Sequence, residues 1–479
     1  MRIKMILPAL SEATAPGYRP IKYSLVPPLG LAALAAHCDP ADEIELCDEH
    51  VEPLRLETEA DERPDLVVIE VYITSARRSY EIADHYRRLG VRVALGGLHP
   101  TSRPDEAAAH ANHVFLGPGD DTWPRFLADL AAGRPEPRYQ STERTLVGAP
   151  PVRRDLIKRH RYLVPNSLVV TRGCPHACDF CYRDAFFTGG RGFYTQPVDD
   201  ALAEIDRLPG RHLYFLDDHI LGHRRFAREL FVGLTGAGRV WQAAATVRSV
   251  LQDDLIERAA DAGLRSLFVG FETLSPDNLS LHAKGHNLGH DYAEAIRRLH
   301  GLGIMVNASF VFGMDGDGPD VFDRTVAWAV DQGIETATFH IMTPYPGTGL
   351  YRRMEAEGRL LHHDWDRYDT RHVVYRPRGM TADELEAGYW GAYDSFYRWG
   401  SILRGAGTKP TLAGTARHVA YSAGWKKFEP VWDLAIRARR MPFLLPVLER
   451  VLDRRGQPSE PAPLTRLVVE PRTARSPVA

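Results

Sequence analysis

The chain has 479 residues, more than one hydrophobic core normally supports, so two or three domains are expected. Its 59 lysines and arginines nearly balance 62 acidic residues, and the formal net charge of -3 does not indicate a nucleic-acid partner. The chain contains no apolar run long enough to span a membrane, and its first residues lack a signal-peptide pattern. These properties predict a cytoplasmic multidomain protein, for which membrane contact is not expected.

The first part of the chain, from Met1 to about Gly133, alternates β-branched runs with helical patterns. The strand-like runs are 3–7, 43–47, 66–73 and 92–95, and the helical patterns include 31–37 and 80–89. This alternation predicts an α/β domain with a flavodoxin-like (Rossmann-type) doubly wound parallel sheet. Residues 134–166 combine prolines and arginines with little periodicity, which predicts a linker that packs on both neighbouring domains.

From residue 167 to residue 345 the alternation resumes with a longer repeat. Six strands are predicted, at 167–171, 212–216, 242–247, 266–271, 305–312 and 336–342. They predict a (β/α)6 partial TIM barrel, whose chemistry belongs at the carboxyl ends of the strands. Residues 346–454 are helical and aromatic in pattern, which predicts a helical cap over the barrel mouth, and residues 455–479 are predicted to be a disordered tail.

Three of the five cysteines, Cys174, Cys178 and Cys181, follow the first predicted barrel strand within eight residues. Three thiolates on one loop can hold three irons of a 4Fe-4S cubane, which leaves the fourth iron open to a small chelating ligand. A structural zinc site is the alternative, but zinc prefers four closed ligands and no second ligand pair is evident. His176, inside the loop, is interpreted as a residue without a metal role.

The Cys-x3-Cys-x-Phe-Cys spacing resembles the signature of the radical S-adenosylmethionine superfamily. The resemblance implies a 4Fe-4S cluster, S-adenosylmethionine on the open iron, and an external one-electron reductant such as flavodoxin or ferredoxin. It implies a 5′-deoxyadenosyl radical that abstracts hydrogen from an unactivated carbon. The implied S-adenosylmethionine contacts are Phe180 at the adenine, Asp217 at the ammonium, Arg248 at the carboxylate, Glu272 at the ribose, and Ser309 near the adenosine or substrate. For Asp217 and Arg248, a purely local ion pair or cap is the alternative.

Small residues gather in four loops of the first domain, where the backbone can approach a ligand closely. These loops resemble those of the cobalamin-binding domain that precedes the barrel in one class of the superfamily. The implied cobalamin contacts are Pro28, Leu29, Gly30, Thr74, Ser75, Gly96, Gly97, His99, Pro100, Gly117, Gly119 and Asp120. Asp120 stands where that domain usually has glutamate.

Three further residues of this domain receive other interpretations. Asp48-Glu-His50 partly matches a motif that supplies a histidine to cobalt, but its final glycine is replaced by Pro53, so we expect no cobalt ligand from it. Cys38 and Cys47 lie in apolar runs and are predicted to be core residues.

Together the two resemblances imply methylation of an unactivated carbon in a small natural-product or lipid precursor, by way of methylcobalamin. One alternative is cyclisation or rearrangement that uses cobalamin without methyl transfer. Another is a non-catalytic cobalamin or redox sensor. The basic and then apolar run 437–448 is predicted to be a terminal helix packed on the barrel rather than a membrane contact, and no pattern indicates an oligomeric state.

Overall fold

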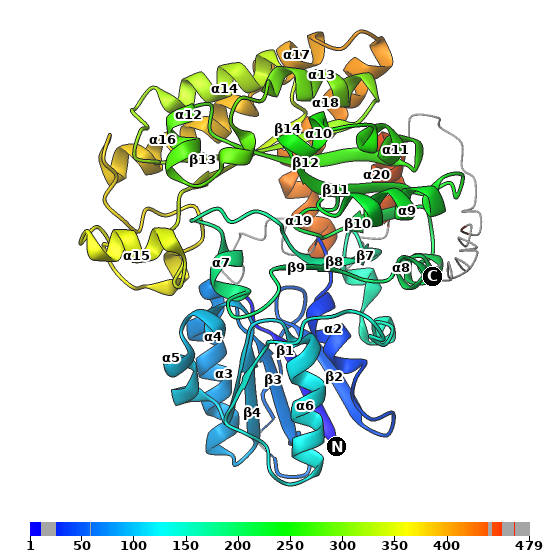
Figure 1. The fold of residues 1–479 in the computed structure, drawn as a ribbon, viewed down its shortest axis with the longest axis vertical. Helices are drawn as coiled ribbons and strands as arrows, with labels where there is room; N and C mark the ends of the chain where they lie inside the picture. Colours follow the sequence, from blue (N-terminus) through cyan, green and yellow to red (C-terminus); the bar gives the residue numbers. More distant parts are fainter. Residues whose placement is uncertain (11–24, 58, 439–442, 453–463, 465–479) are drawn as a thin grey trace, which may run out of the picture.

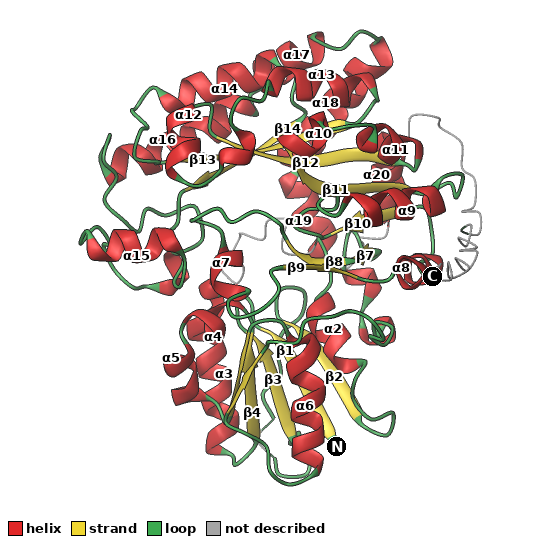
Figure 2. Cartoon of the chain, viewed as in Figure 1, coloured by secondary structure: helices red, strands yellow, loops and turns green. Residues whose placement is uncertain are grey.

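The computed structural model describes residues 1–10, 25–57, 59–438, 443–452 and 464. They form two α/β domains, one below the other in the view of Figure 1, with further helices following the second domain. Figure 2 shows a sheet inside each domain and helices on the outside. Among the described residues, no helix is long and apolar enough to cross a membrane.

The first domain contains a six-stranded parallel sheet in the order β2-β1-β3-β4-β5-β6. Its strands are β1 (Arg2–Leu7), β2 (Glu43–Asp48), β3 (Leu66–Glu70), β4 (Arg92–Gly96), β5 (His113–Leu116) and β6 (Arg138–Gln140). Its helices are α2 (Leu29–Ala35), α3 (Ala76–Arg88), α4 (Leu98–Ser102), α5 (Pro104–His110) and α6 (Gly119–Ala131), and η2 (Ile73–Ser75) is a 3-10 turn. Alternate side chains of β1 enter different cores, with Met5 on one face and Ile6 on the other. The doubly wound sheet is therefore confirmed.

The sheet continues beyond the predicted domain boundary at residue 133, because β6 pairs with β5. A three-residue strand in a proline-rich segment leaves no periodicity to detect. The rest of the linker contacts both domains, through η3 (Arg154–Leu156) and η4 (Arg159–Arg161). The Tyr162 hydroxyl donates to Asp48 in the first domain at 2.9 Å, and Arg154 pairs with Glu204 in the second at 2.6 Å.

The second domain is an open six-stranded parallel barrel in the order β14-β13-β12-β11-β10-β7. Its strands are β7 (Ser167–Leu168), β10 (His212–Phe215), β11 (Val240–Thr246), β12 (Leu264–Glu272), β13 (Met305–Phe312) and β14 (Thr336–Ile341). Its helices are α7 (Tyr182–Phe186), α8 (Val198–Asp206), α9 (Arg224–Leu234), α10 (Val247–Leu251), α11 (Leu255–Asp261), α12 (Pro276–Leu281), α13 (Tyr292–Gly301), α14 (Val321–Asp331) and α15 (Gly349–Ala356), with the 3-10 turn η5 (Gly285–Asn287). The predicted partial barrel is confirmed.

The first predicted barrel strand is divided into two. Only β7 belongs to the barrel, while β8 (Thr171–Gly173) pairs antiparallel with β9 (Phe193–Thr195). The division has a local cause, because Asp217 accepts the backbone N–H groups of Val170 and Thr171 at 3.1 and 2.5 Å.

The helical C-terminal region is confirmed, but its predicted position over the barrel mouth is wrong. Its elements are the 3-10 turn η6 (Trp365–Arg367) and the helices α16 (Ala382–Phe396), α17 (Trp399–Gly407), α18 (Leu412–Lys426), α19 (Glu429–Arg437) and α20 (Leu445–Leu452). The Tyr393 and Tyr397 hydroxyls hydrogen-bond to the backbone of β14, the edge strand, and thereby cover its free side. Tyr421 of α18 reaches Gln242 and Ser266, near the amino ends of their strands. The aromatic face thus predicts a packed helix but not which surface it covers.

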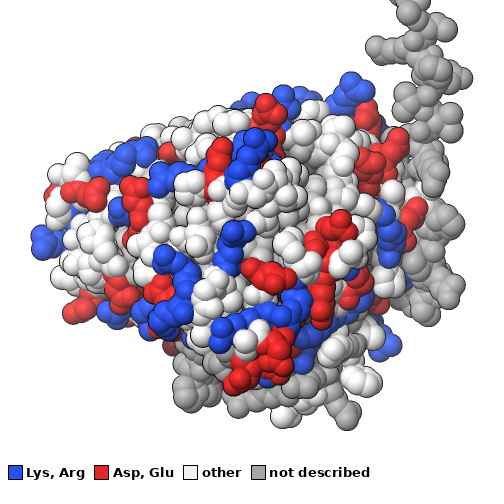
Figure 3. Space-filling model, turned by 90° about the horizontal axis from the view of Figure 1, so that it is seen from below, with Lys and Arg blue, Asp and Glu red and all other residues white. Residues whose placement is uncertain are grey.

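The end of the chain is described only in part. The Glu449 carboxylate of α20 accepts from the backbone N–H of His212 at 3.3 Å, so this helix packs on the barrel. Most of the basic run, residues 439–442 and the side chain of Arg437, lies outside the described residues, as does the predicted tail apart from Leu464. On the face seen from below in Figure 3, basic and acidic side chains are interspersed.

A buried charge cluster joins the C-terminal helices to the amino end of β14. Glu335 is 3% exposed and lies 2.5 Å from the Lys409 ammonium and 3.2 Å from His300. Burial raises the pKa of Glu335, but the hydrogen bond from His300, the His418 imidazole at 3.8 Å and the charge of Lys409 outweigh it, so the pKa lies well below its ordinary value of 4.5.

The Glu335→Gln variant is therefore expected to be less stable by about 3–5 kcal/mol at pH 7, because Lys409 would remain buried without its counter-ion. Since the folded-state pKa is depressed, the carboxylate stabilises the fold above pH 4.5 and loses this effect as the pH falls towards the folded-state value. Thermal unfolding at pH 7 and pH 4 measures both effects. The control is Glu229→Gln, which removes only a pair with the exposed Arg225. Equal unfolding temperatures for the two variants at pH 7 would contradict the prediction.

Candidate functional site

The cysteine loop leaves the β8–β9 hairpin at a residue that must be glycine. Gly173 has φ +73°, and a Cβ atom there would collide with the carbonyl of Gly192. The loop then carries three free thiols, of which Cys178 is buried and Cys174 and Cys181 are half-buried. Burial raises the pKa of Cys178 to about 11, so a metal bound by this thiol would have to displace a proton.

Three residues predicted to contact S-adenosylmethionine are brought together beside this loop. Glu272 ends β12 at a bulge with φ +65°, and its Oε2 atom lies 3.4 Å from the Ser309 hydroxyl. Lys284, which sequence reasoning missed, contacts Glu272 Oε1 at 2.5 Å and lies 6.0 Å from the Phe180 ring centroid. Burial lowers the pKa of Lys284, but the Glu272 and Cys178 charges outweigh it and raise the pKa above its ordinary value. Because Lys284 follows a short helix in an irregular segment, no periodicity marked it.

Asp217 occupies a different environment from the one predicted. It is 2% exposed, and its Oδ1 atom accepts from the Thr171 hydroxyl at 2.6 Å as well as from two backbone N–H groups. Burial raises its pKa to about 6, although the Thr171 hydrogen bonds oppose the shift. These contacts match the local structural role and do not favour an ammonium contact. Its neighbour Asp218 is exposed and accepts from the Tyr182 hydroxyl at 2.6 Å.

Arg248 lies in the first turn of α10 and is exposed. After burial and the charge of Lys284, the Arg248 charge contributes to the lowered pKa of two histidines that the sequence did not indicate as a group, His176 and His286. Their rings stack at 3.7 Å, and the His219 ring lies 5.8 Å from that of His176. Burial is the larger cause and lowers the pKa of His176 to about 4, so this imidazole is neutral at pH 7. The three histidines come from three separate loops, so only the fold brings them together.

A cavity of about 550 Å³ lies between the carboxyl edge of the first sheet and a part of the second domain that includes β7, β8 and α8. Seven predicted cobalamin contacts line it: Leu29, Gly30, Gly96, Gly97, Gly117, Gly119 and Asp120. Five others do not: Pro28, Thr74, Ser75, His99 and Pro100. His99 is fully buried, with Nε2 at 2.9 Å from Glu106, and the Ser75 hydroxyl bonds to the Tyr72 carbonyl. These two side chains support the loops from behind.

The residues lining the cavity fit a corrin ring with its amide side chains. Gly97 lines the cavity with φ +112°, and a Cβ atom there would lie 2.9 Å from the Val71 carbonyl oxygen, so this part of the lining must be glycine. Among the described residues, Gln196 Oε1 and one Arg154 nitrogen are buried without a hydrogen-bond partner, and both residues line the cavity. Such atoms can pair with peripheral amides.

Glu70 is a cavity residue that the sequence analysis missed. It ends β3, and burial raises its pKa to about 7, although a hydrogen bond from Tyr72 opposes the shift. Its position at the carboxyl end of a central strand, where ligands of parallel sheets bind, could have indicated it.

Asp120 connects the cavity to the cysteine loop. It accepts from the Tyr194 hydroxyl at 2.8 Å and lies 3.6 Å from Arg172. Tyr194 and Arg172 belong to the β8–β9 hairpin, and only Gly173 separates Arg172 from Cys174. The aspartate at the position of the usual glutamate therefore joins the two domains where both cofactors are expected.

The remaining interpretations of the first domain concern residues away from the cavity. His50 pairs with Asp48 at 2.9 Å and does not line the cavity. Cys38 and Cys47 are buried in separate cores, as predicted. Burial raises the pKa of Cys38 to about 11 and that of Cys47 to about 12, so both are neutral thiols.

Comparison with known proteins identifies both domains. The model of the Radical SAM superfamily matches residues 168–347, and that of the B12 binding domain matches residues 23–127. The chain is 28% identical over 359 residues to bacteriochlorophyllide d C-12(1)-methyltransferase of Chlorobaculum tepidum, which covers 72% of this chain and 77% of that protein. It is 25% identical over 358 residues to hopanoid C-2 methylase of Rhodopseudomonas palustris, covering 71% and 66%.

Two solved structures share the fold over most of the chain. The radical S-adenosylmethionine methyltransferase TsrM of Kitasatospora setae has a TM-score of 0.64 at 15% identity and covers 92% of this chain and 99% of that one. The cobalamin-dependent enzyme OxsB, with aqua-cobalamin and S-adenosylmethionine bound, has a TM-score of 0.65 at 14% identity and covers 95% and 76%. The zinc and sensor alternatives are therefore set aside. The chain belongs to the radical S-adenosylmethionine enzymes that carry a cobalamin-binding domain, and its cofactors are a 4Fe-4S cluster, S-adenosylmethionine and cobalamin.

Proposed function

We propose that the enzyme transfers a methyl group to an unactivated carbon of a largely apolar natural-product or lipid precursor. The observation that carries the proposal is that the two cofactor sites are close together in the chain. Arg172 lines the cobalamin cavity, and Cys174, two residues later, begins the cluster loop. A substrate held at this junction would be within reach of both cofactors. The similarity to methyltransferases that act on bacteriochlorophyllides and hopanoids supports methyl transfer to a ring-containing apolar molecule.

Aromatic side chains from both domains support an apolar substrate. Tyr72 of the first domain is 43% exposed, and after burial, Asp218 and Cys181 it contributes to the raised pKa of Tyr182, so the two tyrosines lie near each other. Tyr182 follows Cys181 directly, and Tyr345 lies near the same cysteine. These rings can pack against a flat apolar molecule beside the cluster.

The residues at the barrel mouth receive separate roles in this proposal. When bound, the cluster and S-adenosylmethionine would supply the 5′-deoxyadenosyl radical, and cobalamin would supply the methyl group. Cys174, Cys178 and Cys181 hold the cluster, and an external flavodoxin or ferredoxin supplies its electron. Phe180 lies against the adenine, and Arg248 binds the carboxylate.

Two acidic side chains are assigned to the ribose and to the ammonium of S-adenosylmethionine. Glu272 and Ser309 hydrogen-bond to the ribose hydroxyls, with Lys284 fixing the Glu272 side chain. Asp218, rather than the buried Asp217, receives the ammonium of S-adenosylmethionine.

Product mass tests the proposal. A host that expresses the protein is fed methionine with a deuterated methyl group, and its lipid and pigment extracts are compared with those of a host expressing Cys178→Ala. We expect compounds that are one methylene heavier and carry the label. New products of unchanged mass, or lighter by two hydrogens, would contradict methyl transfer and support the cyclisation or rearrangement alternative.

A further inference from the structure

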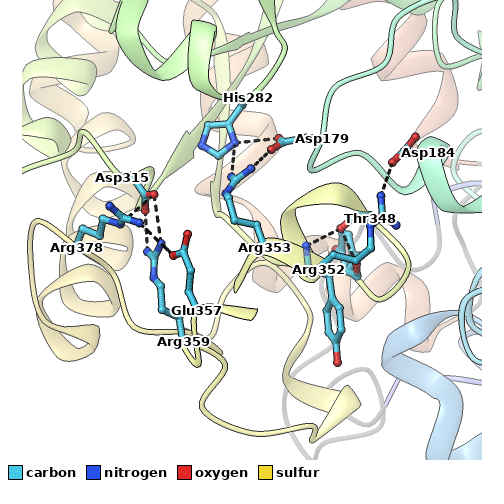
Figure 4. Close-up of polar contacts among 12 residues, drawn as sticks. Asp179, Asp184, His282, Asp315, Thr348, Arg352, Arg353, Glu357, Arg359 and Arg378 are labelled. Carbon is cyan, nitrogen blue, oxygen red and sulfur yellow. Dashed lines mark hydrogen bonds and ion pairs between the residues drawn. The ribbon is translucent and has the colours of Figure 1, made fainter. Parts of the chain in front are cut away.

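Helix α15 contacts the cysteine loop and the following helix α7 through two adjacent arginines (Figure 4). Arg353 forms an ion pair with Asp179 at 2.6 Å, and Asp179 lies between Cys178 and Phe180. Arg352 is 3.7 Å from Asp184 of α7, and its side chain is 64% exposed. Of the two arginines, Arg353 therefore makes the shorter and less exposed contact, and only its partner belongs to the cysteine loop.

Every polar group of Asp179 has a partner outside the loop. Its Oδ1 atom lies 2.9 Å from Nδ1 of His282, a residue that is 1% exposed, and its backbone N–H donates to the His282 carbonyl at 3.3 Å. The Asp179 carbonyl accepts from the Leu350 N–H of α15 at 2.9 Å. Arg353 is also 3.5 Å from His282 Nδ1, so the three side chains form one closed cluster.

The same helix is tied to the cobalamin-binding domain. Arg103, which lies between α4 and α5, donates a hydrogen bond to the Tyr351 hydroxyl. The Arg103 guanidinium is 5.1 Å from the Tyr351 ring centroid and 5.1 Å from that of Trp365. One short helix thus contacts the cluster loop on one side and the cobalamin domain on the other.

We propose that Arg353 is a positioning residue for the iron–sulfur cluster. Through Asp179 it fixes the loop that presents Cys178 and Cys181, and through Tyr351 its helix sets the place of that loop relative to the cobalamin cavity. The proposal rests on the proposed function in that the loop carries the cluster. A charge-assisted pair to a partly buried carboxylate is strong enough for this role, and contacts of this kind fix metal ligands in other sites.

The test compares three variants of the full chain after anaerobic reconstitution. Arg353→Met removes the charge and keeps the bulk, Arg353→Lys restores a charge, and Arg352→Met is the matched control on the same helix. Iron release to a ferrous chelator and the electron paramagnetic resonance spectrum of the reduced cluster, with and without S-adenosylmethionine, are measured. We expect Arg353→Met to release iron about 10- to 100-fold faster and to show an altered spectrum. Arg353→Lys should recover much of the retention, and Arg352→Met should match the wild type.

Identical iron retention and spectra for Arg353→Met and the wild type would overturn the proposal. If Arg353→Met binds no corrinoid and has therefore not folded, Asp179→Asn takes its place, since it leaves the arginine and the side-chain volume unchanged. Wild-type retention and spectra in that variant would also overturn the proposal. A wild-type chain that binds no cluster would instead contradict the proposed function, so the two failures are distinguishable.

Discussion

The Cys178→Ala variant is expected to lose the iron–sulfur cluster and all formation of 5′-deoxyadenosine while it keeps its corrinoid. The two remaining thiolates, of Cys174 and Cys181, are too few to hold the cluster, which needs three cysteine ligands. The cavity between the domains is lined by other residues, so its shape should not depend on this thiol. Iron and sulfide content, the visible absorbance of the reconstituted protein and chromatography of the nucleoside product measure the three effects separately.

Cys38→Ala is the matched control, because Cys38 is also a buried thiol but lies in the core of the first domain. This variant should keep the cluster and cleave S-adenosylmethionine like the wild type, with a loss of stability of about 1 kcal/mol. A Cys178→Ala protein with a full complement of iron that still cleaves S-adenosylmethionine would refute the assignment of the loop.

The Gly30→Leu variant is expected to show the converse pattern, with little corrinoid and an intact cluster. Gly30 lies in the first turn of α2 without a positive φ, so a larger residue is compatible with the backbone there. A Cβ atom at this position would be 3.3 Å from the Glu70 carboxylate, and the rest of a leucine would enter the cavity. Overpacking of this kind costs about 1–3 kcal/mol, so corrinoid affinity should fall roughly 5- to 150-fold.

The control for this substitution is Gly391→Leu on the exposed face of α16, where an added Cβ atom meets nothing within 4 Å. Corrinoid titration followed by absorbance, together with the yield of 5′-deoxyadenosine, tests the pair. Unchanged corrinoid affinity in Gly30→Leu would show that the cofactor does not occupy this cavity. A simultaneous loss of the cluster would show that the substitution disturbs more than the cavity.

The two cofactor sites were predictable from the sequence to different degrees. The three cysteines lie within eight residues, so their spacing alone places them on one loop. The cobalamin loops are spread over about a hundred residues, and their small residues mark only the carboxyl edge of a parallel sheet. Seven of the twelve predicted contacts line the cavity. His99 follows two of them, Gly96 and Gly97, in the same segment, but its side chain is buried in the domain interior. Proximity in sequence predicts that residues share a loop, but it does not predict the direction in which each side chain points.

The sequence by itself determined the order of the domains and the alternation of strands and helices, and it placed the three proposed cluster ligands on one loop, because each of these depends on local pattern and spacing. Only the tertiary structure decided that Lys284 pairs with Glu272, that three histidines meet at the barrel mouth, and that the C-terminal helices cover the β14 edge. These arrangements join residues that are distant in the chain, and their positions follow from the packing of whole elements. Local periodicity indicates that one face of a helix or strand is buried, but it does not indicate which element packs against that face.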